Sequence, residues 1–493
     1  MEDGTPRGVV SRRQWLQVGG LTGLGLALRI VGLHAKAYWT DEVATVNLVR
    51  GGFGHAMSEV ARVENTPPLY FVLAWPWAHL FGTSEVGLRS LSTVFSVALI
   101  PIAYLIGEQL IGSRVGLVAA ALVATNPMLV WYGQEARGYA LLSFLTGVSF
   151  LLFLRALHTP TTGRLVAWGA CCGLAVATHY FAVFLVAAEA AVLLWKSRRR
   201  VPVATASAIP VVTALGLVPL KFTQESQRVD WISEMSLAGR VIKAPAVLII
   251  GFEAPAPYAV TALAALICAA GVWLLVFRAA SEVRRQGLLA LGIGAASFAL
   301  ALLGAHYFLY RNVLGAVVPI LAGLACGFGA AHAGHLGPAL AAALCLLSVG
   351  VVLATAHSPK FGKDDWRNAA AVVERGGGDK AIVVTPSGSR PPLAYYLGAR
   401  QAPFEGPGLR VAEIAVVAGA DRPPGSGVTA AHPPTRATRP APAGFVLEGR
   451  DEHRYFTVIT YRAPSREWVS RDALEALTLG REPRIIALGA EDT

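Results

Sequence analysis

The chain has 493 residues, of which 54% are hydrophobic and only 15% are charged, and its mean hydropathy is +0.52. A soluble domain usually carries about 25% charged residues, so this balance excludes a disordered chain, a collagen-like chain and an ordinary soluble enzyme. The 42 Lys and Arg outnumber the 31 Asp and Glu, which gives a net charge of +11. Because the apolar residues come in blocks of about twenty, the length that crosses a bilayer, we predict a polytopic membrane protein.

Eleven apolar blocks are predicted to form transmembrane helices. They lie at about residues 15–35, 86–106, 113–131, 137–156, 165–179, 181–195, 201–219, 257–277, 287–305, 312–331 and 337–356. With the N-terminus, residues 1–14, in the cytoplasm, alternation places 13 Lys and Arg on the inner side, as the positive-inside rule requires. The alternative for the first block is a twin-arginine export signal at Ser11 to Leu16, with a mature chain beginning at Tyr38.

The first outer loop, about residues 36–85, is predicted to contain interfacial helices. Thr40 is the expected N-cap of a helix from Asp41 to Arg50, in which Val43, Val46 and Val49 recur on one face. Pro67-Pro68 then opens an apolar helix from Leu69 to Phe81, which is too short to span a bilayer.

The C-terminal segment, residues 357–493, has the charge density of a soluble domain, with 18 basic and 16 acidic residues. Its apolar pattern predicts strands at 380–384 and 456–461, helices at 364–374 and 466–477, and loops through the Pro- and Gly-rich stretch 402–446. An odd number of spans puts this segment outside, so we expect a small extracytoplasmic α/β domain. The transmembrane domain, residues 15–356, precedes it.

Metal and disulfide chemistry find little support in the sequence. All five cysteines lie inside apolar blocks without zinc spacing, so neither a zinc site nor a disulfide framework is expected. Asp41 and Glu42 could hold a divalent cation, but no full ligand set is visible. No cofactor is required by this interpretation, and the excess of positive charge does not indicate nucleic acid, since it lies in short loops between spans.

Asp41 and Glu42 are the first candidates for chemistry. They follow the outer end of the first span, where a carboxylate could take the proton of an acceptor hydroxyl beside a leaving group that stays in the bilayer. The alternative is that they only favour the helix dipole, because acidic residues stabilise the first turn of a helix.

Three arginines at outer ends of spans are candidate ligands of a lipid phosphate. Arg137 is followed by Tyr139, Arg311 is preceded by Tyr310, and Arg89 opens the second span. A guanidinium offers a planar fork that matches phosphate oxygens. The alternatives are a local pair of Arg137 with Glu135, and simple interfacial anchoring for the others.

Four further residues draw attention because of their charge or position. Glu64 and Asn65, before Thr66-Pro67-Pro68, could line a polar pocket or only end a helix before proline. Arg29 near the end of the first span is expected to extend its charge to the interface, and Glu189 is an acidic residue in mid-span with no evident partner.

The order of these motifs resembles the C-type (GT-C) membrane glycosyltransferases. The motifs are Tyr38-Trp39-Thr40-Asp41-Glu42, Thr66-Pro67-Pro68-Leu69-Tyr70-Phe71, Gly87-Leu88-Arg89-Ser90, Glu135-Ala136-Arg137-Gly138-Tyr139-Ala140 and Tyr310-Arg311-Asn312. Within that group the chain is similar to the branch of dolichyl-phosphate-mannose protein mannosyltransferases and bacterial lipid A aminoarabinose transferases. The resemblance covers about residues 15–330. Many relatives carry His or Lys before the Pro-Pro pair, whereas this chain has Thr66.

The resemblance implies transfer of a sugar from a polyprenyl-phosphate donor, with inversion, on the outer face of the cytoplasmic membrane. The acceptor would be a protein, a polysaccharide or a glycolipid. Asp41 would act as general base and Glu42 would assist it. Arg137, Arg89 and Arg311 would bind the lipid phosphate.

Two other functions are compatible with the residues. A transporter or flippase of a lipid-linked or small solute would need ionisable residues deep in several spans, and the sequence offers mainly Glu189. A non-catalytic assembly factor would use the C-terminal segment to bind a partner.

Overall fold

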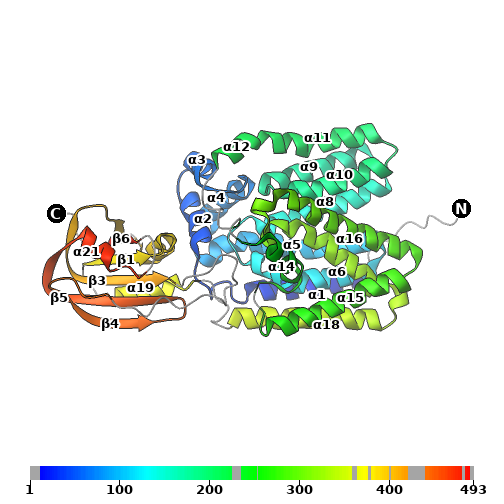
Figure 1. Cartoon of the computed structure of the whole chain (residues 1–493). Coiled ribbons are helices and arrows are strands. Elements are labelled where there is room, and N and C mark those ends of the chain that lie inside the picture. The colour runs from blue at the N-terminus through cyan, green and yellow to red at the C-terminus, as the bar shows by residue number, and fades with distance from the viewer. Residues whose placement is uncertain are drawn as a thin grey trace. The chain divides into compact units, whose positions relative to one another are not determined.

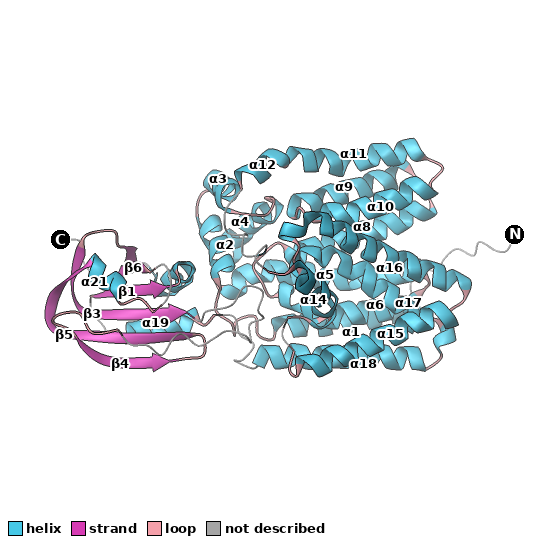
Figure 2. Ribbon diagram, viewed as in Figure 1, coloured by secondary structure: helices cyan, strands magenta, loops and turns pink. Residues whose placement is uncertain are grey.

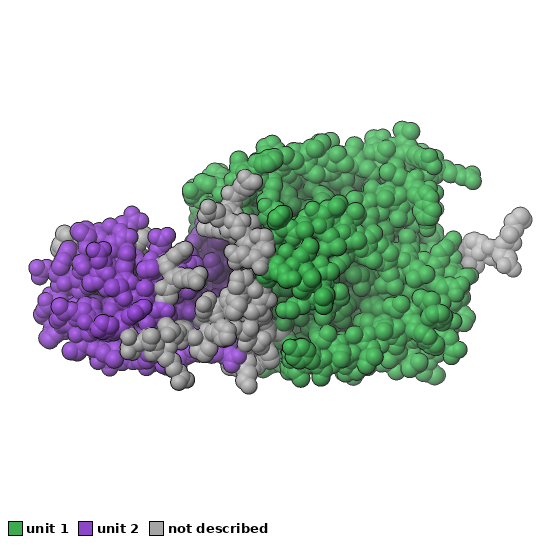
Figure 3. Space-filling view, in the orientation of Figure 1, with its two compact units in different colours: residues 1–33, 48–357 green, residues 34–47, 358–493 purple. Residues whose placement is uncertain are grey.

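The computed structural model forms two compact units (Figure 3). The first contains residues 1–33 and 48–357, and the second contains residues 34–47 and 358–493. The structure describes residues 11–224, 232, 235–252, 254–357, 364–375, 379–398, 401–419, 439–479 and 483–488. The second unit thus takes part of the predicted first outer loop, and the division falls within a single helix, α2 (Thr40–Arg50).

The first unit is built from helices in its described part (Figure 2). They are α1 (Arg12–Ile30), α3 (Phe53–Val63), α4 (Leu69–Phe81), α5 (Glu85–Leu110), α6 (Ser113–Thr125), α7 (Pro127–Gly133), α8 (Tyr139–His158), α9 (Thr162–Thr178), α10 (Ala182–Lys196), α11 (Arg200–Gly216), α12 (Val218–Thr223), α14 (Leu237–Ile250), α15 (Pro257–Trp273), α16 (Ser281–Ala301), α17 (Val317–Gly329) and α18 (Leu336–His357), with short helices η2 (Leu274–Arg278), η3 (Leu302–Tyr307), η4 (Tyr310–Ala316) and η5 (Ala331–Ala333). Most of the long helices run nearly parallel or antiparallel to one another (Figure 1).

The predicted polytopic helical fold is confirmed. Helical segments occupy all the predicted spans, and α2 and α4 match the two helices expected in the first outer loop. Within the described residues, seven helices are long and apolar enough to cross a membrane, or eight if the pair α6 and α7 forms one span. The number eleven remains a prediction.

The pair α6 and α7 is bent by 57° at Asn126-Pro127. Proline has no N–H to continue the helical ladder, so a new helix must start there. The Asn126 side chain caps it, since its Oδ1 accepts from the N–H of Leu129 at 3.0 Å. Its Nδ2 donates to the carbonyl of Leu248 at 3.0 Å, which ties α7 to the end of α14. This bend determines the direction in which the chain reaches residues 133–138.

Hydrogen bonds join the connections that alternation assigns to the same side. Arg114 donates to the Gly334 carbonyl at 2.8 Å, and Arg199 donates to the Pro160 carbonyl at 2.9 Å. Both bonds link connections predicted on the inner side. Alternation of the spans therefore agrees with the contacts of the first unit.

The second unit contains a six-stranded sheet in the order β2-β6-β1-β3-β5-β4. The strands are β1 (Lys380–Thr385), β2 (Gln401–Pro403), β3 (Gly408–Gly419), β4 (Val446–Glu452), β5 (Phe456–Ser470) and β6 (Arg484–Leu488). Strands β1 and β3 are parallel, and the other neighbouring pairs are antiparallel. The predicted α/β domain is thus present in residues 358–493.

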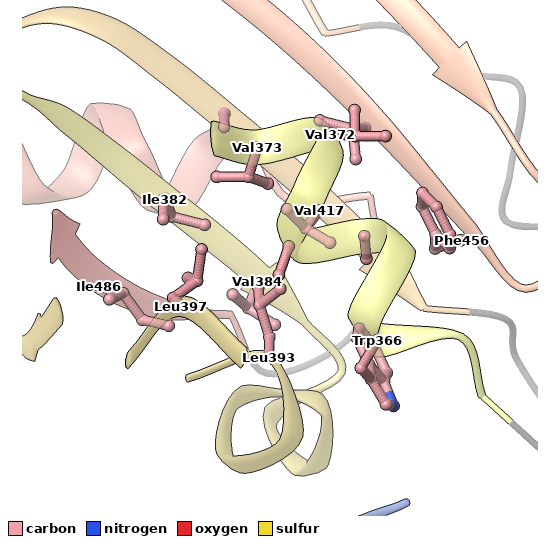
Figure 4. Packing of buried hydrophobic residues seen from close by; sticks show 14 of the residues in the cluster. Trp366, Val372, Val373, Ile382, Val384, Leu393, Leu397, Val417, Phe456 and Ile486 are labelled. Carbon is pink, nitrogen blue, oxygen red and sulfur yellow. The ribbon is translucent and has the colours of Figure 1, made fainter. Parts of the chain in front are cut away.

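Helices cover both faces of this sheet, which is why all six residues of β1 are buried. Ile382 and Val384 pack under α19 (Trp366–Glu374) and α20 (Arg390–Leu397), where Leu393 and Leu397 meet them (Figure 4). Ala381 and Val383 point to the other face, toward a cluster that includes Leu474 of α21 (Arg471–Ala476). Alternate side chains of β1 therefore contribute to two hydrophobic cores, one on each face of the sheet.

Two predictions for this domain are wrong. The expected loop 402–446 contains β3, a central strand whose apolar residues fill both cores, and residues 420–438 lie outside the described part. The expected helix 466–477 begins only at Arg471, because β5 continues to Ser470 and pairs there with Gly408. In both places the pairing between strands overrides the local preference of the sequence. Ser470 then caps the shortened helix by accepting from the N–H of Ala473.

Candidate functional site

Arg137 and Glu64 form a buried, two-pronged ion pair in the first unit. The Nη1 and Nη2 groups of Arg137 donate to Oε1 and Oε2 of Glu64, each at 2.9 Å. Arg137 is 7% exposed and Glu64 is 4% exposed. Such a fork-to-fork arrangement fixes the plane of the guanidinium as well as its position. The structure therefore brings together two residues predicted for the site that lie 73 positions apart.

The backbone around Arg137 is held by α5. Thr93 donates to the Gly133 carbonyl at 2.8 Å, and Ser92 donates to the Arg137 carbonyl at 3.3 Å. Gly138 allows a close approach to α4, because a Cβ there would lie 3.3 Å from the Cβ of Tyr70. The turn between α7 and α8 thus presents Arg137 from a fixed support.

The backbone around Glu64 is held by Gln224, which directly follows α12. Its Nε2 donates to the carbonyls of Val60 and Thr66, both at 3.0 Å, and its Oε1 accepts from the Tyr180 hydroxyl at 2.8 Å. Gln224 is fully buried. It spans the end of α3 and the start of the Pro-Pro segment, so it fixes the short stretch that carries Glu64 and Asn65. Asn65 itself is partly exposed.

Aromatic rings gather beside Arg137. The rings of Tyr132 and Tyr139 are tilted by 48° with their centroids 4.5 Å apart, and Phe252 lies 5.8 Å from Tyr132 and 4.8 Å from Tyr310. The Arg137 guanidinium lies 5.7 Å from the ring of Phe71. The two predicted tyrosines, Tyr139 and Tyr310, therefore belong to one cluster, which Phe252 completes.

His179 directly follows the last residue of α9 and joins this cluster. Its ring lies 5.9 Å from that of Tyr139, and its Nδ1 accepts from the N–H of Phe181 at 3.2 Å. The positive charges of Arg311 and Arg137 act on this ring. Arg311 also interacts electrostatically with Tyr132.

Arg89, in the same unit, makes its own contact with the backbone. It is 2% exposed, and its Nη1 donates to the Leu33 carbonyl at 2.8 Å. That carbonyl lies just beyond the end of α1. Arg89 is therefore placed where it contacts the backbone that leads out of the first predicted span.

Asp41 and Glu42 lie in the first turn of α2, within the second unit. Glu42 is fully buried and Asp41 is partly exposed. Helix α2 begins at Thr40, and the N–H of Val43 bonds to the carbonyl of Trp39, so Trp39 occupies the position expected for a cap. The hydroxyl of Thr40 instead donates to the Gly388 carbonyl at 3.1 Å. The prediction that Thr40 caps the helix is thus wrong.

Two ionisable residues in predicted spans have structural partners. Arg29 is fully buried and donates from Nε to Ser96 at 2.7 Å and from Nη1 to the carbonyls of Gly25 and Ala124 at 2.9 Å. The expectation that it reaches the interface is wrong, because these acceptors satisfy it inside the helical unit. Glu189 accepts from Trp168 at 2.8 Å and from Ser149 at 3.3 Å.

Two residues that contact this site, Gln224 and Phe252, were not predicted from the sequence. Gln224 and Phe252 lie in the long connection 220–256, far in sequence from the residues they contact. The local sequence around them gave no sign of these partners. In the described part of the chain, no group of three or more His, Cys, Asp or Glu could hold a metal ion.

Comparison with known proteins agrees with the predicted resemblance over part of the chain. Residues 65–221 match the family model described as dolichyl-phosphate-mannose-protein mannosyltransferase. This segment includes Arg89 and Arg137 and begins directly after Glu64. The match confirms the resemblance to a membrane glycosyltransferase. The sequence matches none of the curated proteins.

Several solved structures are similar to the chain at low sequence identity. The Cupriavidus metallidurans ArnT bound to undecaprenyl phosphate is 13% identical, with a TM-score of 0.43, over 91% of this chain and 98% of that one. The Archaeoglobus fulgidus oligosaccharyltransferase in the apo form is 14% identical, with a TM-score of 0.46, over 78% and 60%.

The Saccharomyces cerevisiae protein O-mannosyltransferase complex Pmt1-Pmt2, bound to the sugar donor, is 18% identical, with a TM-score of 0.36. The match covers 44% of this chain and 33% of that one. The chain thus spans a third of the length of the yeast protein that it matches.

Proposed function

We propose that the protein transfers a sugar from a polyprenyl-phosphate donor to an acceptor on the outer face of the cytoplasmic membrane. The observation that carries this proposal is the oriented Arg137 guanidinium within the segment that matches the mannosyltransferase family model. The ring of Phe71 lies 5.7 Å from it, and Tyr139, two residues further along the chain, packs against Tyr132 and His179. A cation held among aromatic rings suits a phosphate attached to a long apolar chain.

The pair with Glu64 supports rather than opposes a phosphate site. The guanidinium is a rigid planar fork, and the two bonds to Glu64 fix both its position and its plane. The Glu64 carboxylate fixes the guanidinium before the donor binds, so little side-chain entropy is lost when it does. Arg137 is thus the principal ligand of the phosphate in this proposal. Arg311 and Arg89 assist it.

The chemical step in this proposal uses Asp41. The carboxylate takes the proton of the acceptor hydroxyl, whose oxygen attacks the anomeric carbon. The bond between that carbon and the phosphate oxygen breaks, and the polyprenyl phosphate leaves with its charge stabilised by the arginines. Attack opposite to the leaving group inverts the anomeric carbon. Glu42 assists by its negative charge next to Asp41.

The topology in this proposal has the N-terminus in the cytoplasm and the C-terminal domain outside. It rests on the 13 Lys and Arg that fall on one side of the alternating spans. The donor's lipid stays in the bilayer while the acceptor arrives from the aqueous side.

Analysis of a strain lacking the gene tests the function. We expect one glycan or glycolipid to lose a sugar, and the matching polyprenyl-phosphate sugar to accumulate. Restoration by the wild-type gene, but not by a gene encoding Asp41→Asn, would assign the loss to transfer. Unchanged glycans together with an unchanged pool of lipid-linked sugars would contradict the proposal.

A further inference from the structure

Residues 34–40 lead into α2. Several separate contacts attach them to the C-terminal α/β domain, residues 358–493, which is called the outer domain below. The N–H of Tyr38 donates to the hydroxyl of Tyr396 at 2.7 Å, and the ring of Tyr38 meets that of Tyr395 edge-on at 5.5 Å. Two residues on, the Thr40 hydroxyl donates to the carbonyl of Gly388 at 3.1 Å. Tyr38 is fully buried. The start of α2 is therefore fixed on both sides of Trp39.

A further contact holds the beginning of this segment. Arg367 of α19 donates to the His34 carbonyl at 3.1 Å, and its guanidinium lies 5.9 Å from the ring centre of Tyr396. The same arginine thus connects the segment to the tyrosine that receives the N–H of Tyr38. The contacts belong to a continuous network and are not isolated surface bonds.

The outer-domain residues that make these contacts are themselves rigidly supported. Leu393 and Leu397 of α20 are buried in the core, whereas Tyr395 and Tyr396 lie on the partly exposed side of the same helix. Because residues four apart share a helix face, the two leucines anchor α20 to the sheet, and the partly buried Tyr396 packs against the same cluster. Gly388 lies in η7 (Ser387–Ser389), in the turn that follows β1.

We propose that the outer domain positions the proposed general base, with Tyr396 and the Gly388 carbonyl fixing the first turn of α2 and hence Asp41. The C-terminal domain is then a working part of the transferase and not an attached module that only binds a partner. Tyr396 is a positioning residue, since it acts on the backbone at Tyr38, three residues before Asp41. This inference rests on the proposed role of Asp41.

The first test measures the attachment itself by hydrogen exchange of the full-length protein in detergent. Tyr396→Phe removes the hydroxyl that accepts from Tyr38 and keeps the ring. We expect amides 38–47 to exchange about 5–30-fold faster, the range that corresponds to a local loss of 1–2 kcal/mol. Tyr461→Phe is the matched control, because the Tyr461 hydroxyl also bonds to the backbone, donating to the carbonyl of Arg439 at 2.7 Å elsewhere in the domain. Unchanged exchange in Tyr396→Phe, or equal acceleration in the control, would overturn the attachment.

The second test measures transfer, with undecaprenyl-phosphate mannose as donor probe and membranes of the deletion strain as acceptor. Tyr396→Phe should lower kcat about 10–100-fold and leave the KM for the donor unchanged, because a misplaced base slows the chemical step without loosening the phosphate. Thr40→Val should act in the same direction, and Thr40→Ser should restore the rate because it restores the hydroxyl. A wild-type kcat in Tyr396→Phe, or a parallel rise in the donor KM, would overturn the positioning role.

Parallel measurement of Asp41→Asn separates this inference from the proposed function. If Asp41→Asn is inactive while Tyr396→Phe has wild-type kcat, the positioning role is wrong and the general base stands. If Asp41→Asn transfers sugar at the wild-type rate, the proposed base is wrong and the positioning role is wrong with it.

Discussion

Glu64 and Asp41 are two acidic residues of the predicted first outer loop, and they are held by different means. In the first unit, Glu64 is fixed through its own carboxylate, both of whose oxygens accept from Arg137. In the second unit, the turn that carries Asp41 is fixed through the backbone of Tyr38 and the hydroxyl of Thr40. Both oxygens of Glu64 are therefore directed at the guanidinium of Arg137 and orient it. This contrast fits the proposed division of roles, in which Asp41 takes the proton and Glu64 orients Arg137.

The largest expected effect concerns the base itself. Asp41→Asn should lower the rate of sugar transfer by about 10²–10⁴, the usual cost of losing a general base, without unfolding the protein. Glu64→Gln should lower it far less, since an amide still offers one acceptor to Arg137. Initial rates of both variants in the same vesicles check this order. The reverse order would exchange the roles of the two residues.

The buried pair should make a large contribution to folding as well. Arg137→Met leaves the Glu64 carboxylate buried without its partner, and this should lower the free energy of unfolding by about 3–5 kcal/mol. The double variant Arg137→Met/Glu64→Leu should recover most of that loss, because no charge remains buried. Denaturant titration of the purified variants in detergent measures both values. Equal destabilisation of the single and double variants would show that charge burial is not the cause.

Removing the bridge that supports Glu64 should have a smaller effect. Gln224→Leu removes the side-chain donor to the carbonyls of Val60 and Thr66, so we expect a loss of about 1–3 kcal/mol in unfolding free energy. Donor binding should weaken in the same variant, because the segment that carries Glu64 loses its support. Stability and donor binding that both match the wild type would exclude a role for Gln224.

The smallest effect is expected from a substitution of Arg62, which lies two residues before Glu64. Arg62 pairs with Glu59 at 2.8 Å on the exposed face of α3. Exposed pairs contribute little because water screens them and their side chains lose entropy. Arg62→Ala should therefore change neither unfolding nor transfer measurably. A clear loss of transfer in that variant would mean that the surface of α3 takes part in binding.

The sequence allowed some elements to be predicted accurately, because local signals bound them. Helix α4 begins after Pro68 and ends before Gly82, whose φ of +79° suits glycine, and both ends match the prediction. Residues that alternation put on the outer side, such as Glu64 and Arg137, also proved able to meet. Their pairing was not predicted, because a single sequence does not show which of several outer charges face each other.

Other parts depended on contacts far apart in the chain. Strand β3 was not predicted because Pro and Gly are frequent around it. Its apolar residues form a strand because they pair with β1 and β5, which are distant in sequence. Arg29 was expected at the interface because no partner near it in sequence could satisfy it, whereas Ala124 and Ser96 do so from two other helices. In each case tertiary partners decided the outcome.

Binding of undecaprenyl phosphate to the purified protein tests the proposed phosphate site most directly, since this ligand is common to donors that differ in sugar. Native mass spectrometry should show a one-to-one complex. Arg137→Gln should weaken it about 10–100-fold, as expected for losing a charged hydrogen bond, and Glu64→Gln should still bind. Equal binding by Arg137→Gln and the wild type, or no complex with the wild type, would contradict a lipid-phosphate site at Arg137.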